Sequence, residues 1–396
     1  MRRSKAQLDC TEEVLRAIPE TASTIHRALG SIGGSGTRFR HHADTPLITD
    51  VVLIDEASMV DLALMSRLVD AAPLSARLIL IGDKDQLASV EAGAVLGDIC
   101  STGAARSYSH PMVEAVAGLT GYRLPVEADA PHATGLADCI VHLTRSYRYG
   151  ERGGISALAR AINAGDGTLA MSILRSPEYP EVSLAAPPAD GRLNDRLRDA
   201  VLQGFGPYLK EQDPEAQLRA FERLRILCAH RRGPQGMETL NRLIEKVLAE
   251  AGLLRTETAS YAGRPVMVTE NDYQIGLFNG DVGLICNAPD DGGSKLACFV
   301  APDGRLRRLA PSRLPGHETV FAMTVHKSQG SEFDEVAILL PTRPSPILSR
   351  ELLYTAVTRA RSKVTIYGTP EVISAAVTRR IDRASGLREV LWERES

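Results

Sequence analysis

The chain has 396 residues and a formal net charge of −3; 44% of its residues are hydrophobic and 24% are charged. This length allows two domains, and the composition is typical of a globular protein. No stretch approaches the roughly 18 uninterrupted apolar residues of a membrane span, and the first residues lack the apolar core of a signal peptide. We therefore expect a cytoplasmic protein with no membrane partner. The charge gives no global basic field, although a local groove is enough to grip one strand of nucleic acid.

The six cysteines stand far apart in the sequence, and none forms a Cys-x-x-Cys pair. This spacing argues against a zinc site or a disulfide framework. We expect all of them to act as small buried hydrophobic residues. They are Cys10, Cys100, Cys139, Cys228, Cys286 and Cys298.

Short apolar runs that end abruptly in polar residues or glycine recur along the chain. Such runs are typical of strands covered on both faces in parallel sheets, which bind ligands beyond the carboxyl ends of their strands. Helical patterns lie between them, for example at 233–252, so the predicted fold class is α/β. The predicted strands are 51–55, 77–83, 140–144, 224–229, 335–341 and 363–368.

Composition shifts predict the domain organisation. Residues 102–137 and 176–195 are rich in Pro, Ala, Gly and Ser and predict surface loops or family-variable insertions. A domain junction is expected near 205–222. Short β-type pieces separated by turn signals then predict a small antiparallel barrel inserted in the second domain. The predicted ranges are 1–215 for the first domain, 216–396 for the second and 263–318 for the barrel.

An adjacent acidic pair, Asp55 and Glu56, follows the first predicted strand in VVLIDEASMVDL. An aspartate at a strand end can hold the shell of a magnesium ion, and a neighbouring glutamate can deprotonate an attacking water. The pair alone is a weak signal. A strand-end acidic pair that caps the next helix is an equally good interpretation.

A second strand ends in Gly82 and Asp83, and Gln86 follows three residues later. A glutamine in this position can bond to a γ-phosphate or to the attacking water. The alternative is a turn with an exposed amide. The short distance from the first strand favours the functional interpretation, because about one helix separates neighbouring strands of one sheet.

Five segments of the chain occur in a recognisable order. They are VVLIDEASMVDL, LIGDKDQLASVEAGAVLGDI, HLTRSYRYGERGGI, VFAMTVHKSQGSEFDEVAILLP and ELLYTAVTRARSKVTIYG. In that order they resemble the motifs of superfamily one helicases, and most closely those of the RecD family, the α subunits of exodeoxyribonuclease V. The similarity covers nearly all of the chain.

The resemblance implies two RecA-like domains, with ATP and Mg²⁺ as cofactors. It implies that Asp55 binds Mg²⁺ through water, that Glu56 activates the attacking water and that Gln86 senses the γ-phosphate. Arg148 and Arg359 would neutralise charge on the transferring phosphoryl group, a task that suits the planar guanidinium better than an amine.

The neighbouring arginines, Arg145 and Arg361, are interpreted as surface or phosphate-contact residues. A single arginine without this motif context is more often a solvated charge.

The HKSQG segment resembles the part of these helicases that links the nucleotide to the DNA track. Glycine allows close backbone approach, and the polar side chains can bind phosphates and sugars without reading bases. By resemblance, Gly82, Asp83, Gly330 and Glu332 would lie at the nucleotide. A helix start capped by Ser328 is the alternative for this segment. The DNA-binding candidates here are Thr324, His326, Lys327, Ser328 and Gln329.

TIHRALG, at 24–30, resembles the segment in which Thr24 and His26 contact single-stranded DNA. This signal is short. His26 fits equally well as an ordinary histidine on a helix face.

A helicase motor needs a phosphate loop, G-x-x-x-x-G-K-[ST], and no such string occurs in the 396 residues. The glycines Gly33, Gly34 and Gly36 are followed by no lysine at the required spacing, and we interpret them as turn residues. The opening residues, MRRSKAQLDCTEEVL, resemble the helix downstream of that loop. The expectation is therefore a chain that begins inside the first motor domain and hydrolyses ATP poorly on its own.

The sequence supports three functions. The first is a RecD-like, ATP-dependent 5′ to 3′ DNA helicase subunit that acts in double-strand-break repair with single-stranded DNA and with RecB-like and RecC-like subunits. The second is a stand-alone RecD-like helicase. The third is a DNA-binding protein that keeps the motif surfaces without catalysis, which the absent lysine favours.

Overall fold

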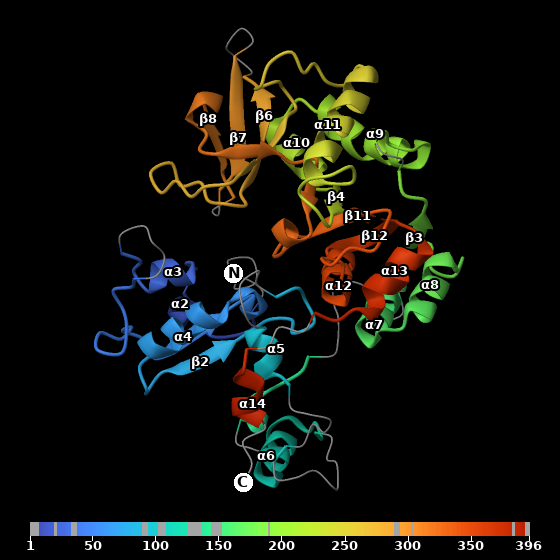
Figure 1. Cartoon of the computed structure of the whole chain (residues 1–396). Helices are drawn as coiled ribbons and strands as arrows, with labels where there is room; N and C mark the ends of the chain where they lie inside the picture. Colours follow the sequence, from blue (N-terminus) through green and yellow to red (C-terminus); the bar gives the residue numbers. More distant parts are fainter. Residues whose placement is uncertain are drawn as a thin grey trace. The chain divides into compact units, whose positions relative to one another are not determined.

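The computed structural model divides into two compact units (Figure 1). The first comprises Met1–Lys84, Ala88–Ile140 and Arg383–Ser396; the second comprises Asp85–Leu87 and Val141–Asp382. In the described part of the chain, no helix is long and apolar enough to cross a membrane. The residues that the structure describes are 8–19, 22–32, 38–88, 94–101, 108–124, 136–143, 153–188, 191–288, 294–301, 304–381 and 385–392.

The first unit is built around two parallel strands, β1 (Val51–Ile54) and β2 (Arg77–Leu80). Helix α4 (Leu62–Ala71) connects them, and the Asp61 side chain caps its first turn. Both strands were predicted from their apolar runs, and the structure confirms them. The other helices of this unit are α2 (Glu12–Ala17), α3 (Ile25–Ala28), α5 (Val95–Ile99), α6 (His110–Thr120) and α14 (Leu387–Trp392).

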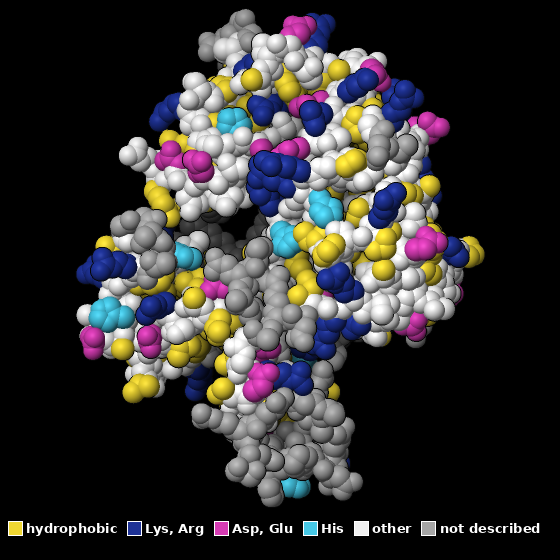
Figure 2. Space-filling model, viewed as in Figure 1, with side chains coloured by type: hydrophobic (Ala, Val, Ile, Leu, Met, Phe, Trp, Pro, Cys, Tyr) yellow, Lys and Arg dark blue, Asp and Glu magenta, His cyan; other side chains and the backbone are white. Residues whose placement is uncertain are grey.

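The two faces of this small sheet differ. Val52, Ile54, Leu78 and Leu80 pack against the core that contains Met65 and Leu68 of α4. The opposite face is exposed, and hydrophobic side chains are visible on the surface of this unit (Figure 2). A sheet of parallel strands usually has both faces covered. The side chains of the exposed face are Val51, Leu53, Ile79 and Ile81.

The second unit contains a five-stranded, all-parallel sheet in the order β10-β4-β11-β12-β3. The predicted α/β class is therefore confirmed, and the RecA-like interpretation fits this sheet. Each residue of the interior strand β4 is buried, as its largely apolar run predicted. The strands are β3 (Val182–Ala185), β4 (Leu224–Cys228), β10 (Ala322–Thr324), β11 (Phe333–Leu339) and β12 (Ala360–Tyr367).

A buried arginine, Arg225 on β4, is held in the core of this unit. Its guanidinium carbon lies 4.1 Å from the centre of the Phe221 ring and 4.7 Å from that of Phe333, and Nη1 donates to the Val320 carbonyl at 2.8 Å. Burial lowers the pKa of Arg225 to about 9. The guanidinium stays charged at neutral pH, because two aromatic faces and a carbonyl replace part of its hydration.

Helices pack against the strands of the parallel sheet and against one another. Contacts join α7 to α12 and α8 to α13, and they join α9 to both α10 and α11. The helices are α7 (Gly154–Ala164), α8 (Gly167–Arg175), α9 (Asp195–Lys210), α10 (Pro214–Phe221), α11 (Met237–Glu250), α12 (Arg350–Thr358) and α13 (Pro370–Thr378).

A second sheet in this unit is antiparallel, with the order β8-β7-β6-β5-β9. The predicted antiparallel texture is therefore present. Among the described residues, β8 and β9 each pair with one neighbour only, so the strands form an open sheet and closure into a barrel is not confirmed. The strands are β5 (Pro265–Val268), β6 (Val282–Asn287), β7 (Lys295–Val300), β8 (Leu306–Leu309) and β9 (His317–Thr319).

Three local predictions were wrong. Residues 140–143 form no strand, and Val141 and Leu143 are 70% and 92% exposed, because an apolar run without a neighbouring strand has nothing to pair with. The predicted loop at 176–195 contains β3, which pairs with β12. The predicted loop at 102–137 contains α6, which is capped by Ser109 and ends at Gly121.

The division of the chain also differs from the predicted boundary at 215. Strand β3 and helices α7 to α9 pack with the sheet of the second unit, so the division falls near residue 140. Hydrogen bonding between the Ser183 and Thr365 hydroxyls, 3.1 Å apart, joins β3 to β12. Such pairing between segments 182 residues apart leaves no local signal in the sequence.

The open edge of the parallel sheet is closed by a side chain. Asn241 of α11 donates to the Ala322 carbonyl at 2.9 Å and accepts from the Ala322 amide at 2.8 Å, as a further strand would. Asn241 is 5% exposed. The amide therefore satisfies both polar groups of β10 at its unpaired edge.

Replacing this amide should destabilise the second unit. Asn241→Leu has a similar volume but leaves the Ala322 N–H and C=O buried without partners, so we expect a loss of about 3 kcal/mol in the free energy of unfolding. Chemical denaturation measures it. Asn287→Ala, at an exposed position of β6, is the control and should change stability by less than about 0.5 kcal/mol. Equal effects of the two variants would contradict the role of Asn241.

The cysteines differ in exposure. Cys228, Cys286 and Cys298 are buried, as predicted, whereas Cys100 is half-buried and Cys10 and Cys139 are exposed. Burial raises the pKa of Cys228 to about 12, and its thiol lies 3.3 Å from the His230 carbonyl. A thiol with this pKa carries almost no thiolate near neutral pH and is inert.

Alkylation should therefore distinguish the exposed cysteines from the buried Cys228 by their rates of reaction. With iodoacetamide at pH 8, we expect Cys10 and Cys139 to react in the folded protein and Cys228 to react only at urea concentrations that unfold the second unit. Peptide mass spectrometry identifies the modified residues. Rapid alkylation of Cys228 in the folded protein would contradict the buried thiol.

Candidate functional site

The acidic pair lies in a tight turn at the end of β1. Asp55 is exposed and Glu56 is half-buried, and the 3-10 helix η1 (Ala57–Met59) follows. Glu56 has φ 53° and ψ 41°, in the left-handed region that residues with a side chain rarely adopt. Its N–H donates to Asp55 Oδ1 at 2.9 Å, and the Ala57 N–H donates to the Ile81 carbonyl at 2.9 Å. The strained turn thus holds both carboxylates at the carboxyl edge of the sheet.

Gly82 sits directly against this turn. A Cβ atom at Gly82 would lie 2.7 Å from Leu96 Cδ2 and 3.0 Å from the Ala57 nitrogen, so a larger residue would push against both. The ends of β1 and β2 therefore lie in close contact, as predicted for neighbouring strands. Asp83, the next residue, is half-buried.

The chemistry of this turn suits magnesium better than a fully protein-bound metal. Among the described residues, no group of three or more His, Cys, Asp or Glu could hold a metal ion. Mg²⁺ commonly uses one or two carboxylates and completes its shell with water and phosphate oxygens. The hydroxyl of Ser58, two residues after Glu56, is buried without a hydrogen-bond partner. The residues present thus fit a magnesium–phosphate group, and sequence reasoning did not single out Ser58.

Gln86 lies in a segment, Asp85–Leu87, that packs with the second unit. Leu87 is 1% exposed in the main hydrophobic core of that unit. Its N–H donates to Thr355 Oγ1 of α12 at 2.8 Å, and its carbonyl accepts from Gln329 Nε2. Gln329 was predicted to contact DNA, but its side-chain amide is bound to the protein backbone.

Arg359 ends α12 and is 2% exposed. Its Nε donates to the Thr355 carbonyl at 3.2 Å, and Nη1 donates to the Ser331 carbonyl at 3.2 Å. The guanidinium therefore lies against the end of the HKSQGS segment and does not point into bulk solvent. Arg148 and Arg145 lie outside the described residues.

Gly330 and Glu332 flank this arginine contact. Gly330 has φ 75°, and no atom lies within 4 Å of a Cβ built there, so backbone conformation rather than space requires glycine. Glu332 forms an ion pair with Arg361, with Nε and Oε2 3.1 Å apart. Arg361 is half exposed, consistent with its interpretation as a surface residue.

The polar residues of HKSQG are not equally accessible. Ser328 is fully buried, and its hydroxyl donates to the Val325 carbonyl at 2.8 Å, so its side chain is not available to DNA in this structure. The segment forms a 3-10 helix, η4 (His326–Ser328), without a side-chain cap, so Ser328 does not act as a cap either. Thr324 and His326 are half-buried at the end of β10.

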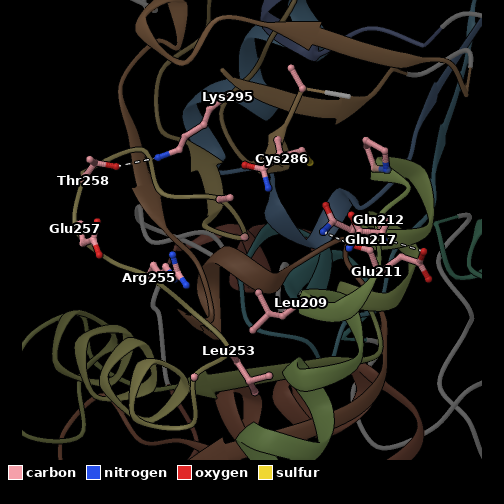
Figure 3. A pocket seen from close by; sticks show the side chains of 16 residues that line it. Leu209, Glu211, Gln212, Gln217, Leu253, Arg255, Glu257, Thr258, Cys286 and Lys295 are labelled. Carbon is pink, nitrogen blue, oxygen red and sulfur yellow. Dashed lines mark hydrogen bonds between the residues drawn. The ribbon is translucent and has the colours of Figure 1, made fainter. Parts of the chain in front are cut away.

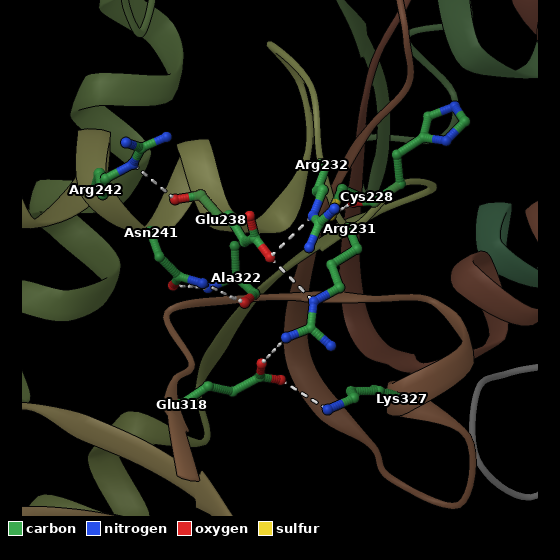
Figure 4. A network of polar contacts seen from close by, with 10 residues as sticks. Cys228, Arg231, Arg232, Glu238, Asn241, Arg242, Glu318, Ala322 and Lys327 are labelled. Carbon is green, nitrogen blue, oxygen red and sulfur yellow. Dashed lines mark hydrogen bonds and ion pairs between the residues drawn. The ribbon is translucent and has the colours of Figure 1, made fainter. Parts of the chain in front are cut away.

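Lys327 belongs to a network of charged side chains (Figure 4). Glu318 on β9 accepts from Lys327 Nζ at 2.7 Å and from Arg231 Nη2 at 3.2 Å, and Arg231 also pairs with Glu238 at 3.1 Å. The Glu318 side chain is 15% exposed. These carboxylates neutralise the cations locally, so a phosphate must compete with Glu318 for Lys327. This network could not be predicted from the sequence, because its members come from four separate segments.

The TIHRALG residues lie on the surface of the first unit. The Thr24 hydroxyl caps α3, where it accepts from the Arg27 amide at 3.4 Å. The exposed His26 ring lies 5.7 Å from the Phe39 ring. Both side chains are accessible, and both have an ordinary structural role.

A cavity of about 810 Å³ in the second unit lies apart from these motifs (Figure 3). Its lining includes Leu209, Leu253, Arg255, Cys286 and Lys295, and Lys295 Nζ donates to Thr258 Oγ1. None of the predicted site residues lines it. It is therefore not the predicted nucleotide site.

Known proteins match this arrangement of motifs. An AAA domain description matches residues 8–109, and a UvrD-like helicase C-terminal domain description matches residues 319–367. The RecBCD enzyme subunit RecD of Mycobacterium tuberculosis is 40% identical over 98% of this chain and 61% of its own length. This chain belongs to the RecD-like superfamily one helicases.

Two further relatives are also RecD-type proteins. RecBCD enzyme subunit RecD of Haemophilus influenzae is 34% identical over 97% of the chain and 61% of its own length. The ATP-dependent RecD2 DNA helicase of Deinococcus radiodurans is 30% identical over 91% of the chain and 42% of its own length. The chain thus spans 61% of the length of the RecD subunits it matches. The structure of Pif1 helicase from Bacteroides in complex with ADP-AlF3 and ssDNA matches with a TM-score of 0.43 and 17% sequence identity. The match covers 91% of this chain and 81% of that chain, and we assign no residue role from it.

The strained turn at Glu56 allows a test by substitution. Glu56→Gly removes the steric cost of the left-handed backbone, whereas Glu56→Ala keeps it, so we expect the glycine variant to be more stable by about 1 kcal/mol. Thermal or urea unfolding of the first unit measures the difference. At the helical, exposed Glu114 of α6 the order should reverse, with alanine more stable than glycine. An alanine variant as stable as glycine at position 56 would contradict the strained turn.

Proposed function

We propose that this chain acts as the motor of an ATP-dependent 5′ to 3′ DNA helicase subunit of the exodeoxyribonuclease V type, in double-strand-break repair. The supporting observation is the convergence of three helicase segments in the second unit. Leu87, next to Gln86, is bound by Gln329 of HKSQG and by Thr355 of α12, and Arg359 of α12 is bound to Ser331. Three segments from distant parts of the sequence thus meet as a nucleotide-responsive motor requires.

In the proposed reaction, Asp55 would hold Mg²⁺ through water, and Glu56 would take the proton of the attacking water. When bound, the magnesium ion would neutralise the developing negative charge on the phosphates of ATP. Arg359 and Arg148 would place guanidinium charge at the transferring group, and Gln86 would bond to the γ-phosphate or the water. Arg359 is already fixed by two carbonyls, so it needs little reorganisation.

The nucleotide and DNA contacts complete this proposal. Glycines at positions 82 and 330, with Asp83 and Glu332, would lie at the nucleotide. The DNA would contact Thr24, His26, Thr324, His326 and Lys327. Ser328 and Gln329 would hold the HKSQG segment in place for this contact, because their side chains are bound to backbone carbonyls. Because the proposed DNA substrate is chromosomal, we place this action in the cytoplasm.

The proposed partners follow from the relatives named as RecBCD enzyme subunits. RecB-like and RecC-like subunits would hold this chain in a complex. The relative named RecD2 DNA helicase keeps a stand-alone motor as an alternative within the same family.

A second candidate function is DNA binding without hydrolysis. The observation that favours it is the absence of any G-x-x-x-x-G-K-[ST] string in the 396 residues, since the backbone amides and lysine of that loop normally cradle the phosphates.

Hydrolysis and binding together distinguish these functions. ATP hydrolysis by the chain is measured with Mg²⁺ and increasing oligo(dT), and oligo(dT) binding by fluorescence anisotropy. Because the chain lacks a phosphate-loop string, we expect a low rate of hydrolysis that oligo(dT) stimulates. Glu56→Gln should lower kcat by about 10²- to 10⁴-fold with unchanged DNA binding, because an amide cannot accept the proton.

Glu250→Gln, on the exposed end of α11, is the control and should leave both properties unchanged. Binding without hydrolysis would support the second candidate and contradict the first. Hydrolysis that survives Glu56→Gln at full rate would contradict the assigned role, and a chain that neither binds nor hydrolyses would refute both functions.

A further inference from the structure

The segment around Gln86 changes units twice within a few residues. Lys84 belongs to the first unit, Asp85–Leu87 to the second, and Ala88 again to the first. Only Leu87 in this segment is fully buried, with 1% exposure. Leu87 therefore anchors the residue next to the predicted γ-phosphate sensor in the core of the second unit.

The backbone of Leu87 is held on both sides by side chains. Its N–H donates to Thr355 Oγ1 at 2.8 Å, where Thr355 is fully buried, and its carbonyl accepts from Gln329 Nε2. In most buried segments the backbone groups pair with other backbone groups. Here both partners are side chains of motif segments, one from HKSQG and one from α12.

These two partners are themselves coupled to the proposed DNA and nucleotide contacts. Gln329 directly follows His326–Ser328 in the chain, and Thr355 lies one helical turn before Arg359 and accepts from its Nε through the backbone carbonyl. A shift of η4 or of α12 therefore moves a hydrogen-bond partner of Leu87.

We infer that Leu87 is a positioning residue that fastens Gln86 to the HKSQG segment and to α12, so that occupancy of the DNA contacts changes the position of the sensor. Leu87 touches neither nucleotide nor DNA in this scheme. Gln329 acts as the transmitting side chain rather than as a DNA ligand. The attachment is a property of the second unit alone, whereas its effect on hydrolysis rests on the proposed function.

Hydrogen exchange at residue resolution tests the attachment without any activity. The Leu87 amide should exchange slowly in the unaltered protein, and in Thr355→Val about tenfold faster, because the isosteric methyl cannot accept the bond. Thr355→Ser, which keeps a hydroxyl, should restore slow exchange. The amides of β4 and β11 should not change in either variant, which shows that the unit remains folded.

The response to oligo(dT) then tests whether DNA binding changes the position of the Gln86 segment. Saturating oligo(dT) should change the exchange rate of amides 85–88 at least about threefold in the unaltered protein and not in Gln329→Met, which keeps the length of the side chain but lacks the donor. Gln274→Met, at an exposed position, is the control and should behave like the unaltered protein. Equal responses in Gln329→Met and the unaltered protein would overturn the inference.

The stimulation of ATP hydrolysis by oligo(dT) is a measurement that would not change if Leu87 had only a structural role. Leu87→Ala should lower the stimulation of kcat by oligo(dT) about tenfold, with KM for ATP and DNA affinity within about twofold, and Leu87→Met should recover most of it. If no variant hydrolyses ATP, the proposed function fails while the exchange experiment still decides the attachment. A Leu87 amide that exchanges equally fast with and without Thr355 would overturn the attachment itself.

Discussion

The carboxyl ends of parallel strands are the constraint on which the rest of this structure depends. A strand buried in a sheet places its last residue at an edge where the backbone turns away and polar groups are free to meet ligands. The acidic pair follows β1, Gly82 and Asp83 follow β2, and HKSQG follows β10. Three of the proposed functional segments of this RecD-like chain therefore begin where a strand stops.

The sequence predicted those segments because their signals are local. Five of the six predicted strands are present, and the acidic pair and Gly82 follow the ends of β1 and β2. The roles of these residues and of Arg359 stay predictions. β3 and the division near residue 140 could not be predicted, since they depend on pairing with β12, far along the chain. The roles of Gln329 and Ser328 were also out of reach, because only packing decides whether a polar side chain faces solvent or a buried carbonyl.

Charge in the second unit is balanced at short range. Lys327 and Arg231 share Glu318, and Arg361 pairs with Glu332. This balance agrees with the net charge of −3, which provides no long-range attraction for DNA. Binding of a strand would exchange carboxylates for phosphates at these cations, so affinity should depend on salt.

We propose that the acidic pair of the first unit, Asp55 and Glu56, and Arg359 of the second unit serve one reaction. A double-mutant cycle on kcat tests it most directly, with Glu56→Gln, Arg359→Lys and the pair combined. Residues that act on one transition state are strongly non-additive, so the account predicts that the double variant is about as slow as the slower single variant. A double variant whose loss equals the product of the two single losses would contradict it.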